Sequence, residues 1–110
     1  MADTVDWPGK SGKTYTHYIY ELPYSFKDDQ PGNYIFTRVE SGSWIPVYIG
    51  QGDLGDRVGE GHHKWQCIKS KRATHVHAHL NKDETARLAE ERDLLARHQE
   101  AYSPKGCNEA

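Results

Sequence analysis

Two strand-like segments separated by a short turn constrain the fold of this chain more than any other feature. Residues 34–39 and 44–50 are rich in β-branched and aromatic side chains, and the residues between them are typical of a turn. The pattern predicts a β-hairpin. Pro46 has no N–H to donate to a neighbouring strand, so we expect an edge or a bulge near the start of the second strand.

Further elements follow the hairpin. Asp53 is a plausible N-cap for a short helix that several glycines weaken. Residues 73–80 alternate between histidine and apolar residues, which is the period of a β-strand. Asn81, followed by Glu84, forms a capping pattern that predicts a helix running to the Ser-Pro break at residues 103–104.

The start of the chain is poor in such signals. It contains several turn-forming residues and one short strand-like stretch at residues 16–22. We therefore expect an N-terminal extension over residues 1–30 and a single domain over residues 31–110. The predicted fold class is α+β, with a small three-stranded, mostly antiparallel sheet flanked by helices.

The composition is typical of a soluble globular domain. The 110 residues are 35% hydrophobic and 27% charged, which suits one compact unit. No apolar run approaches the roughly 18 residues that span a bilayer, and the N-terminus lacks a signal-peptide pattern. We expect no membrane association and an intracellular, cytoplasmic location. Cys67 and Cys107 form no paired motif, so we expect reduced thiols.

The net charge of −2 is unfavourable for a protein that binds nucleic acid by bulk attraction. The charges are unevenly distributed, however, because acidic residues concentrate in the segment 83–100. Basic residues cluster in the middle of the chain, where we expect a substrate-binding face made by Lys64, Lys69, Lys71 and Arg72.

One glutamate of the last helix contradicts the apolar pattern around it. At about 100° per residue, Leu88, Leu95 and Tyr102 share one side of the helix, which is expected to be buried. Glu91 falls inside that side, whereas Glu90 should point to solvent. Burying a carboxylate is costly unless a cation or hydrogen-bond donors compensate it. Glu91 is therefore expected to bind a cation, to extend its carboxylate to solvent or to pair with a nearby arginine.

The hairpin places two tyrosines together. Tyr34 and Tyr48 have the opposite parity to the aliphatic residues of the two strands, which are Ile35, Val39, Val47 and Ile49. If the aliphatic set packs into one core layer, both tyrosines share the other face. They are either functional phenols or packed core residues.

These residues resemble the GIY-YIG nuclease superfamily. Six elements follow the family's order between about Gly32 and Asn108, with Asn33 where the family usually has an aliphatic residue. The elements are Gly32-Asn33-Tyr34, Tyr48-Ile49-Gly50, Leu54 to Arg57, the pair His62 and His63, Glu91 to Leu95, and Asn108. The resemblance implies a nuclease-like domain over residues 31–110.

The resemblance also implies a metal-dependent endonuclease that hydrolyses phosphodiester bonds in DNA. Glu91 would hold one Mg²⁺ or Mn²⁺ ion, and Arg57 would bind the scissile phosphate. Tyr34 would activate the attacking water, assisted by His62 or His63.

Further roles and partners follow from the same resemblance. Tyr48 would orient the water or the phosphate, and Asn108 would bind phosphate or anchor the end of the site that holds Glu91. The implied partner is nucleic acid, most simply double-stranded DNA. Since the chain has no separate DNA-binding domain, specificity would come from the N-terminal extension, from a homodimer or from another subunit.

Two other functions remain open. His75, His77 and His79 project from one face of a predicted strand, which suits a zinc site. Further zinc ligands could come from His62, His63 or Cys67. Without zinc, we expect the strand histidines to line the groove or to contact phosphates. The second alternative is a non-catalytic binding module of the same fold, which the weak net charge favours.

Overall fold

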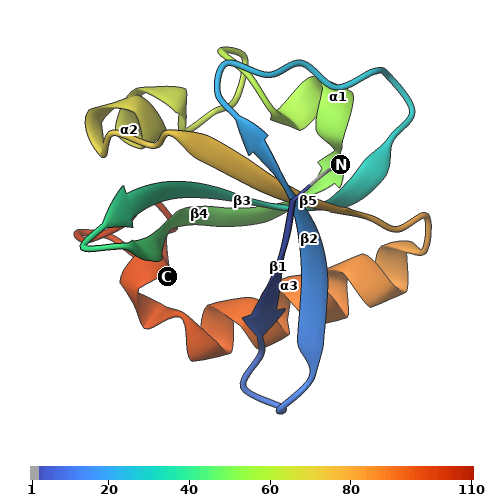
Figure 1. The fold of residues 1–110 in the computed structure, drawn as a ribbon. Helices are drawn as coiled ribbons and strands as arrows, with labels where there is room; N and C mark the ends of the chain where they lie inside the picture. The colour runs from blue at the N-terminus through green and yellow to red at the C-terminus, as the bar shows by residue number, and fades with distance from the viewer. Residues whose placement is uncertain (1–2) are drawn as a thin grey trace.

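The computed structural model describes residues 3–110 as a five-stranded sheet with helices on both faces (Figure 1). The strand order is β1-β2-β5-β3-β4, and all neighbouring strands are antiparallel. The strands are β1 (Thr4–Pro8), β2 (Thr14–Glu21), β3 (Pro31–Glu40), β4 (Ser43–Asp53) and β5 (His75–Leu80). The helices are α1 (Leu54–Arg57), α2 (Trp65–Ser70), α3 (Glu84–Arg97) and the 3-10 turn η1 (Gln99–Ala101).

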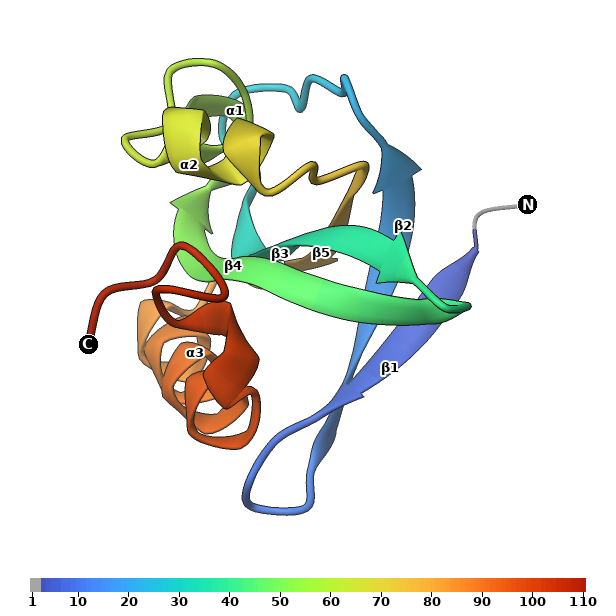
Figure 2. The ribbon, with the colours of Figure 1, turned by 90° about the vertical axis from the view of Figure 1, so that its left-hand side faces the viewer.

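The sheet separates two cores. Helices α1 and α2 lie on one face, and α3 and η1 lie on the other (Figure 2). The core under α1 and α2 includes Tyr34, Phe36, Leu54, Ile68 and Val76. The core under α3 consists of Trp7, Ile35, Ile49, Leu94 and Ala101. The predicted α+β class is confirmed. Within residues 3–110, none of the helices is both long enough and apolar enough to span a lipid bilayer.

The predicted three-stranded sheet is wrong, because the sheet has five strands. The two additional strands, β1 and β2, come from the segment that we expected to be an extension. Strand β2 pairs with β5, where Tyr18 lies opposite Ala78. Trp7 of β1 is 6% exposed, and its indole N–H donates to His77 Nδ1 at 2.9 Å. The sequence indicated only part of β2, as the strand-like stretch at residues 16–22, because its partner β5 is far along the chain and many positions of β1 and β2 are polar.

The predicted hairpin is confirmed as β3 and β4. Its register shifts between Phe36 and Thr37, where Thr37 pairs with Pro46. The irregularity therefore occurs at the proline, as expected for a residue that cannot donate to the ladder. Strand β4 lies at the edge of the sheet, so its outer side is free to receive other segments.

The bulge changes which hairpin side chains share a face. Ile35 and Ile49 pack under α3, as the parity pattern predicts. Val47 instead joins the core on the Tyr34 side, and Val39 is 51% exposed. The parity argument assumed an unbroken period of two, and one additional residue in β4 reverses that period beyond the bulge.

The helix boundaries agree with the sequence in part. Asp53 caps α1 and accepts a hydrogen bond from the N–H of Gly55, as expected. Helix α3 begins later than predicted, because Asp83 rather than Asn81 accepts hydrogen bonds from its first N–H groups. It ends at Arg97, before the predicted break. Helix α2 was not predicted, since its 6 residues are too few to show a helical period.

Cys67 of α2 and Cys107 near the C-terminus form a disulfide, so the prediction of reduced thiols is wrong. The N–H of Cys107 donates to the carbonyl of Val47 at 2.8 Å, which holds the C-terminal segment against β4. The two cysteines are 40 residues apart. Only the packing of α2 and the C-terminal segment brings them together.

Removal of the disulfide should destabilise the protein. A cross-link over 40 residues restricts the unfolded chain, which is worth about 4 kcal/mol in the chain-entropy model. We expect the double variant Cys67→Ser/Cys107→Ser to unfold at a lower urea concentration than the oxidised wild type, as followed by circular dichroism. Reduction of the wild type should give the same loss, and reductant should not affect the double variant. Equal stability of oxidised and reduced wild type would show that the bond does not form in solution.

Candidate functional site

Four predicted site residues form one aromatic cluster between β3, β4 and the loop before α2. The Tyr34 hydroxyl lies 2.9 Å from His62 Nε2. The Tyr34 and Tyr48 rings stack with centroids 6.1 Å apart, and the Tyr48 and His62 rings meet edge-on at 4.7 Å. His63 stacks on His62 at 4.6 Å. The structure therefore brings both hairpin tyrosines and both histidines together.

The hydrogen bonds of His62 determine its tautomer. The backbone N–H of Lys64 donates to His62 Nδ1 at 2.9 Å, so the neutral ring carries its proton on Nε2 and donates it to Tyr34. Burial, with the positive charges of His63 and Arg57, lowers the pKa of His62 to about 4. His62 thus has no free nitrogen to accept a proton, and it acts on Tyr34 as a hydrogen-bond donor.

Two glycines of β4 make room for functional side chains. A Cβ atom at Gly50 would lie 2.5 Å from the Tyr34 hydroxyl oxygen and 2.9 Å from a ring carbon of Tyr48. At Gly52, which has a φ of +143°, a Cβ atom would lie 2.8 Å from Arg57 Nε. The Tyr34 and Arg57 side chains therefore lie across β4 where it lacks side chains of its own.

Arg57 and Glu91 act electrostatically on both phenols. Burial raises the pKa of Tyr34 and of Tyr48; the Glu91 carboxylate raises both further, and Arg57 opposes the rise. Burial also raises the pKa of Glu91 itself, whereas Arg92 and Arg57 lower it. The phenols therefore lie within electrostatic range of both the guanidinium and the carboxylate. Both phenols are protonated at neutral pH.

The residues of the site differ in accessibility. Tyr34 is 1% exposed and His62 is 5% exposed. Tyr48 and Glu91 are half-buried, whereas Arg57 and His63 are exposed. The surface open to a ligand is thus made by the last four residues, with the Tyr34–His62 pair behind them.

Glu91 and Arg57 are both unpaired among residues 3–110. Neither side chain makes a hydrogen bond or an ion pair within 4.0 Å with another described residue. The alternative in which Glu91 is neutralised by a close arginine is therefore not seen. A half-buried carboxylate without a partner is suited to a cation.

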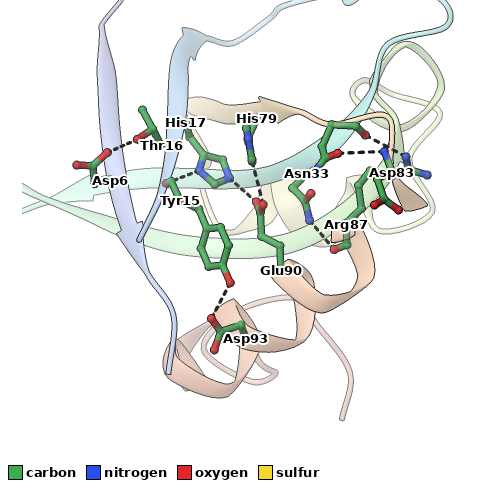
Figure 3. Close-up of polar contacts among 11 residues, drawn as sticks. Asp6, Tyr15, Thr16, His17, Asn33, His79, Asp83, Arg87, Glu90 and Asp93 are labelled. Atoms are coloured by element: carbon green, nitrogen blue, oxygen red, sulfur yellow. Dashed lines mark hydrogen bonds and ion pairs between the residues drawn. The ribbon is translucent and has the colours of Figure 1, made fainter. Parts of the chain in front are cut away.

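The predicted orientation of α3 is wrong in one respect. Glu90, which we expected to face solvent, is 2% exposed and accepts a hydrogen bond from His79 (Figure 3). The buried residues of α3 are Arg87, Glu90 and Leu94. The leucine-rich side containing Leu88 is only partly buried. Helix α3 turns a polar stripe inward because the sheet beneath it also presents polar side chains.

Asn33 is one of those side chains. It is fully buried, and its Nδ2 donates to the backbone carbonyl of Arg87 at 2.9 Å. The guanidinium of Arg87 in turn donates to Gln51 of β4 at 3.0 Å. Asn33 therefore ties β3 to α3 on the face opposite Tyr34.

Asn108 is engaged with β4. Its Oδ1 accepts from the N–H of Ile49, and its Nδ2 donates to the carbonyl of Ile49, both at 2.9 Å. The amide thus pairs with the outer edge of β4 as another strand would, between Tyr48 and Gly50. Both polar atoms are used, so the structure gives Asn108 an anchoring role at β4 in place of a free phosphate-binding amide.

The four residues of the predicted basic face have different surroundings. Lys64 pairs with Glu109, and Lys71 donates to the carbonyl of Pro104 at 2.6 Å, so both hold the C-terminal segment. Lys69 and Arg72 are exposed. Glu109 was not among the predicted site residues, although its charge raises the pKa of Tyr48. No sequence signal identified it, because only the folded C-terminal segment brings it to the site.

The histidines of β5 lie on the other side of the sheet. His77 accepts from Trp7 and lies 3.3 Å from the Thr37 hydroxyl, whereas His79 contacts Glu90 of α3. The His77 and His79 side chains therefore lie on the face of the sheet opposite Tyr34 and His62. Within residues 3–110, no three His, Cys, Asp or Glu side chains are placed to hold one metal ion. Cys67 is bonded to another cysteine, so the predicted zinc set is not assembled.

Comparison of the chain with protein-family models, with curated proteins and with solved structures gives no match in any of the three.

The anchoring role of Asn108 predicts a loss of stability on substitution. Asn108→Ala would leave the N–H and the carbonyl of Ile49 without partners at a buried edge, which should cost about 2–4 kcal/mol. Asn108→Asp keeps the acceptor but loses the donor and should also be destabilised. Denaturant unfolding checks both variants. Full stability of Asn108→Ala would contradict the anchoring role.

The buried, neutral His77 should make the folded protein less stable in acid. Burial lowers its pKa from 6.5 to about 3, with smaller effects from His17 and His75. Because the folded pKa lies below the unfolded value, protonation favours the unfolded chain. The contribution of His77 is complete above pH 6.5 and is lost as the pH falls toward 3. Between pH 6 and 4, the free energy of unfolding should therefore fall less steeply with falling pH in His77→Gln than in wild type. The two slopes should differ by up to about 1.4 kcal/mol per pH unit. Equal slopes would contradict this assignment.

Proposed function

We propose that the protein is a metal-dependent endonuclease of the GIY-YIG type that hydrolyses phosphodiester bonds in DNA. The observation that carries the proposal is the half-buried Glu91 carboxylate, which has no partner among the described residues and acts on Arg57 and both hairpin phenols. A carboxylate in that position is compensated when a divalent cation binds it.

Glu91 would hold Mg²⁺ or Mn²⁺. A hard cation of this kind retains most of its waters and needs few protein ligands, so a single carboxylate is a sufficient anchor. When bound, the ion would neutralise phosphate charge and make a coordinated water more acidic.

Arg57 would bind the scissile phosphate. Its guanidinium is exposed and unpaired, and its stem lies over Gly52, so its planar donors are available for two phosphate oxygens. Tyr48, which is half-buried with its ring 5.9 Å from that of His63, would orient the water or the phosphate.

Tyr34 would accept a proton from the attacking water. Burial holds its phenol in the protonated form, so this role requires more positive charge than Arg57 alone supplies. Donation from His62 Nε2 stabilises the phenolate that such a charge would favour. Since both nitrogens of His62 are occupied, His63 is the histidine that would assist with proton transfer.

The proposed partner is double-stranded DNA. Lys69 and Arg72 are exposed and available for phosphates, but the net charge of −2 is too weak for tight binding through charge alone. We propose that a second copy of the chain or a separate subunit supplies the remaining contacts.

A non-catalytic nucleic-acid or protein-binding module of the same fold is the second candidate. The 1% exposed fraction of Tyr34 favours it, because a general base must reach its substrate. The two candidates differ in whether a phosphodiester bond is broken.

Nicking of supercoiled plasmid tests the proposal. Wild-type protein should convert supercoiled DNA to open circles with Mg²⁺ or Mn²⁺ and should be inactive with EDTA. Glu91→Gln and Arg57→Ala should each reduce the rate by about 100-fold or more. Glu100→Gln, an exposed carboxylate outside the site, is the matched control and should retain full activity.

Three outcomes separate the candidates. Nicking that survives in Glu91→Gln, or that persists in EDTA, would refute the proposed mechanism. Plasmid binding by the wild type with Mg²⁺ and without cleavage would support the binding module. Cleavage that a zinc-selective chelator abolishes in the presence of Mg²⁺ would favour a zinc enzyme.

A further inference from the structure

Helix α3 is attached to the sheet by polar side chains at every third position. Arg87 donates to Gln51 of β4, Glu90 contacts β5 and β2, and Asp93 accepts from the Tyr15 hydroxyl of β2 at 2.7 Å. Figure 3 shows the last two residues pointing from the helix toward these strands. The contacts therefore run along the helix from one side of the sheet to the other.

Glu90 is the most enclosed of the three. Its Oε1 accepts a hydrogen bond from His79 Nδ1 at 2.9 Å, whereas its Oε2 lies 3.5 Å from His17 Nε2, and neither of these last two atoms has a hydrogen-bond partner among the described residues. Glu90 is 2% exposed, and His17 is fully buried. The position of this carboxylate is thus restricted from two neighbouring strands.

The two histidines are themselves held in place. His17 Nδ1 donates to the backbone carbonyl of Tyr15 at 2.9 Å, which directs Nε2 toward Glu90. The antiparallel register that pairs Tyr18 with Ala78 puts His17 opposite His79, and the two rings lie 5.7 Å apart. The neutral His17 ring therefore carries no proton on Nε2, so it encloses Glu90 without donating to it, and the hydrogen bond to the carboxylate comes from His79 of β5.

Directed contacts matter here because α3 buries little apolar surface. Leu94 is the one hydrophobic residue among the buried residues of α3 in the described chain. Apolar contacts are non-directional and tolerate rotation of a helix about its axis, whereas hydrogen bonds restrict distance and angle. The rotation of α3 is therefore fixed mainly by its polar contacts.

The rotation of α3 determines where Glu91 points. Successive residues of an α-helix are about 100° apart, so a carboxylate locked at position 90 fixes the direction of position 91. We propose that Glu90, hydrogen-bonded to His79 and enclosed by the His17 ring, is a positioning residue that directs Glu91 toward Arg57 and Tyr48. The proposal rests on the function proposed above insofar as Glu91 is the metal ligand.

Mn²⁺ binding tests the metal-related part directly, without a cleavage assay. We expect Glu90→Ala to bind Mn²⁺ about 10-fold more weakly or worse, as measured by electron paramagnetic resonance of free and bound ion. Glu90→Gln retains the shape and an acceptor for His79, so it should remain within about threefold of wild type. Rescue by the amide would distinguish positioning from a direct charge effect.

Leu94→Ala is the matched control. It removes apolar packing from the same helix and should lower stability, but it should leave Mn²⁺ affinity within about threefold of wild type under folding conditions. If Glu90→Ala fails to fold, His79→Ala removes the hydrogen bond to Glu90 from a half-exposed position and should still weaken Mn²⁺ binding. Unchanged affinity in a folded Glu90→Ala variant, or in His79→Ala where the first does not fold, would overturn the proposal. Equal weakening by Leu94→Ala would also overturn it.

A metal-free measurement separates this proposal from the proposed function. Nuclear Overhauser contacts between the Glu91 side chain and the Tyr48 ring should appear in wild type, Glu90→Gln and Leu94→Ala, and should be lost in Glu90→Ala. If these contacts behave as expected but wild type binds no Mn²⁺, the positioning role stands and the nuclease proposal fails. If the contacts persist in Glu90→Ala, the positioning role fails whatever the metal does.

Discussion

Tyr34 and Gly50 are cross-strand partners, and the missing side chain at Gly50 allows the Tyr34 ring to lie across β4. The rest of the candidate site depends on this arrangement. His62 donates to the hydroxyl that reaches across the strand, and Tyr48 stacks beside it. Arg57 uses the next gap, at Gly52. Side chains from other elements thus meet over an edge strand that has glycines at two positions.

The C-terminal segment covers the outer edge of β4. Asn108 pairs with Ile49 on the open edge of β4, and Cys107 attaches the same segment to α2 through the disulfide. Lys64 and Glu109 add an ion pair beside the disulfide. The segment therefore connects the edge strand to the helical layer that carries His62 and His63. It also prevents the edge of β4 from remaining an unpaired ladder.

The two faces of the sheet have different chemistry. Aromatic and aliphatic residues under α1 and α2 surround the phenols, whereas polar residues under α3 form directed contacts with the helix. The unpaired Glu91 lies on α3 but acts on phenols that belong to the other face. That link between the faces explains why the rotation of α3 matters for the candidate site.

Local sequence patterns predicted part of the secondary structure and the order of the site residues along the chain. The hairpin, the proline bulge, the cap at Asp53 and the β5 strand were predicted because each depends on neighbours within a few residues. The structure brings Tyr34, Tyr48 and both histidines together and couples the phenols to Arg57 and Glu91, which sequence order could only suggest.

Three features depend on tertiary packing: which side of α3 is buried, which strands β1 and β2 pair with, and which partner each cysteine has. Leucine spacing placed Glu90 in solvent, but that argument assumes an apolar surface beneath the helix. The sheet instead offers His17, Asn33 and His79, so polar residues of α3 turn inward. Such pairings join residues far apart in the chain, and their energies depend on distance and burial that local periodicity does not contain.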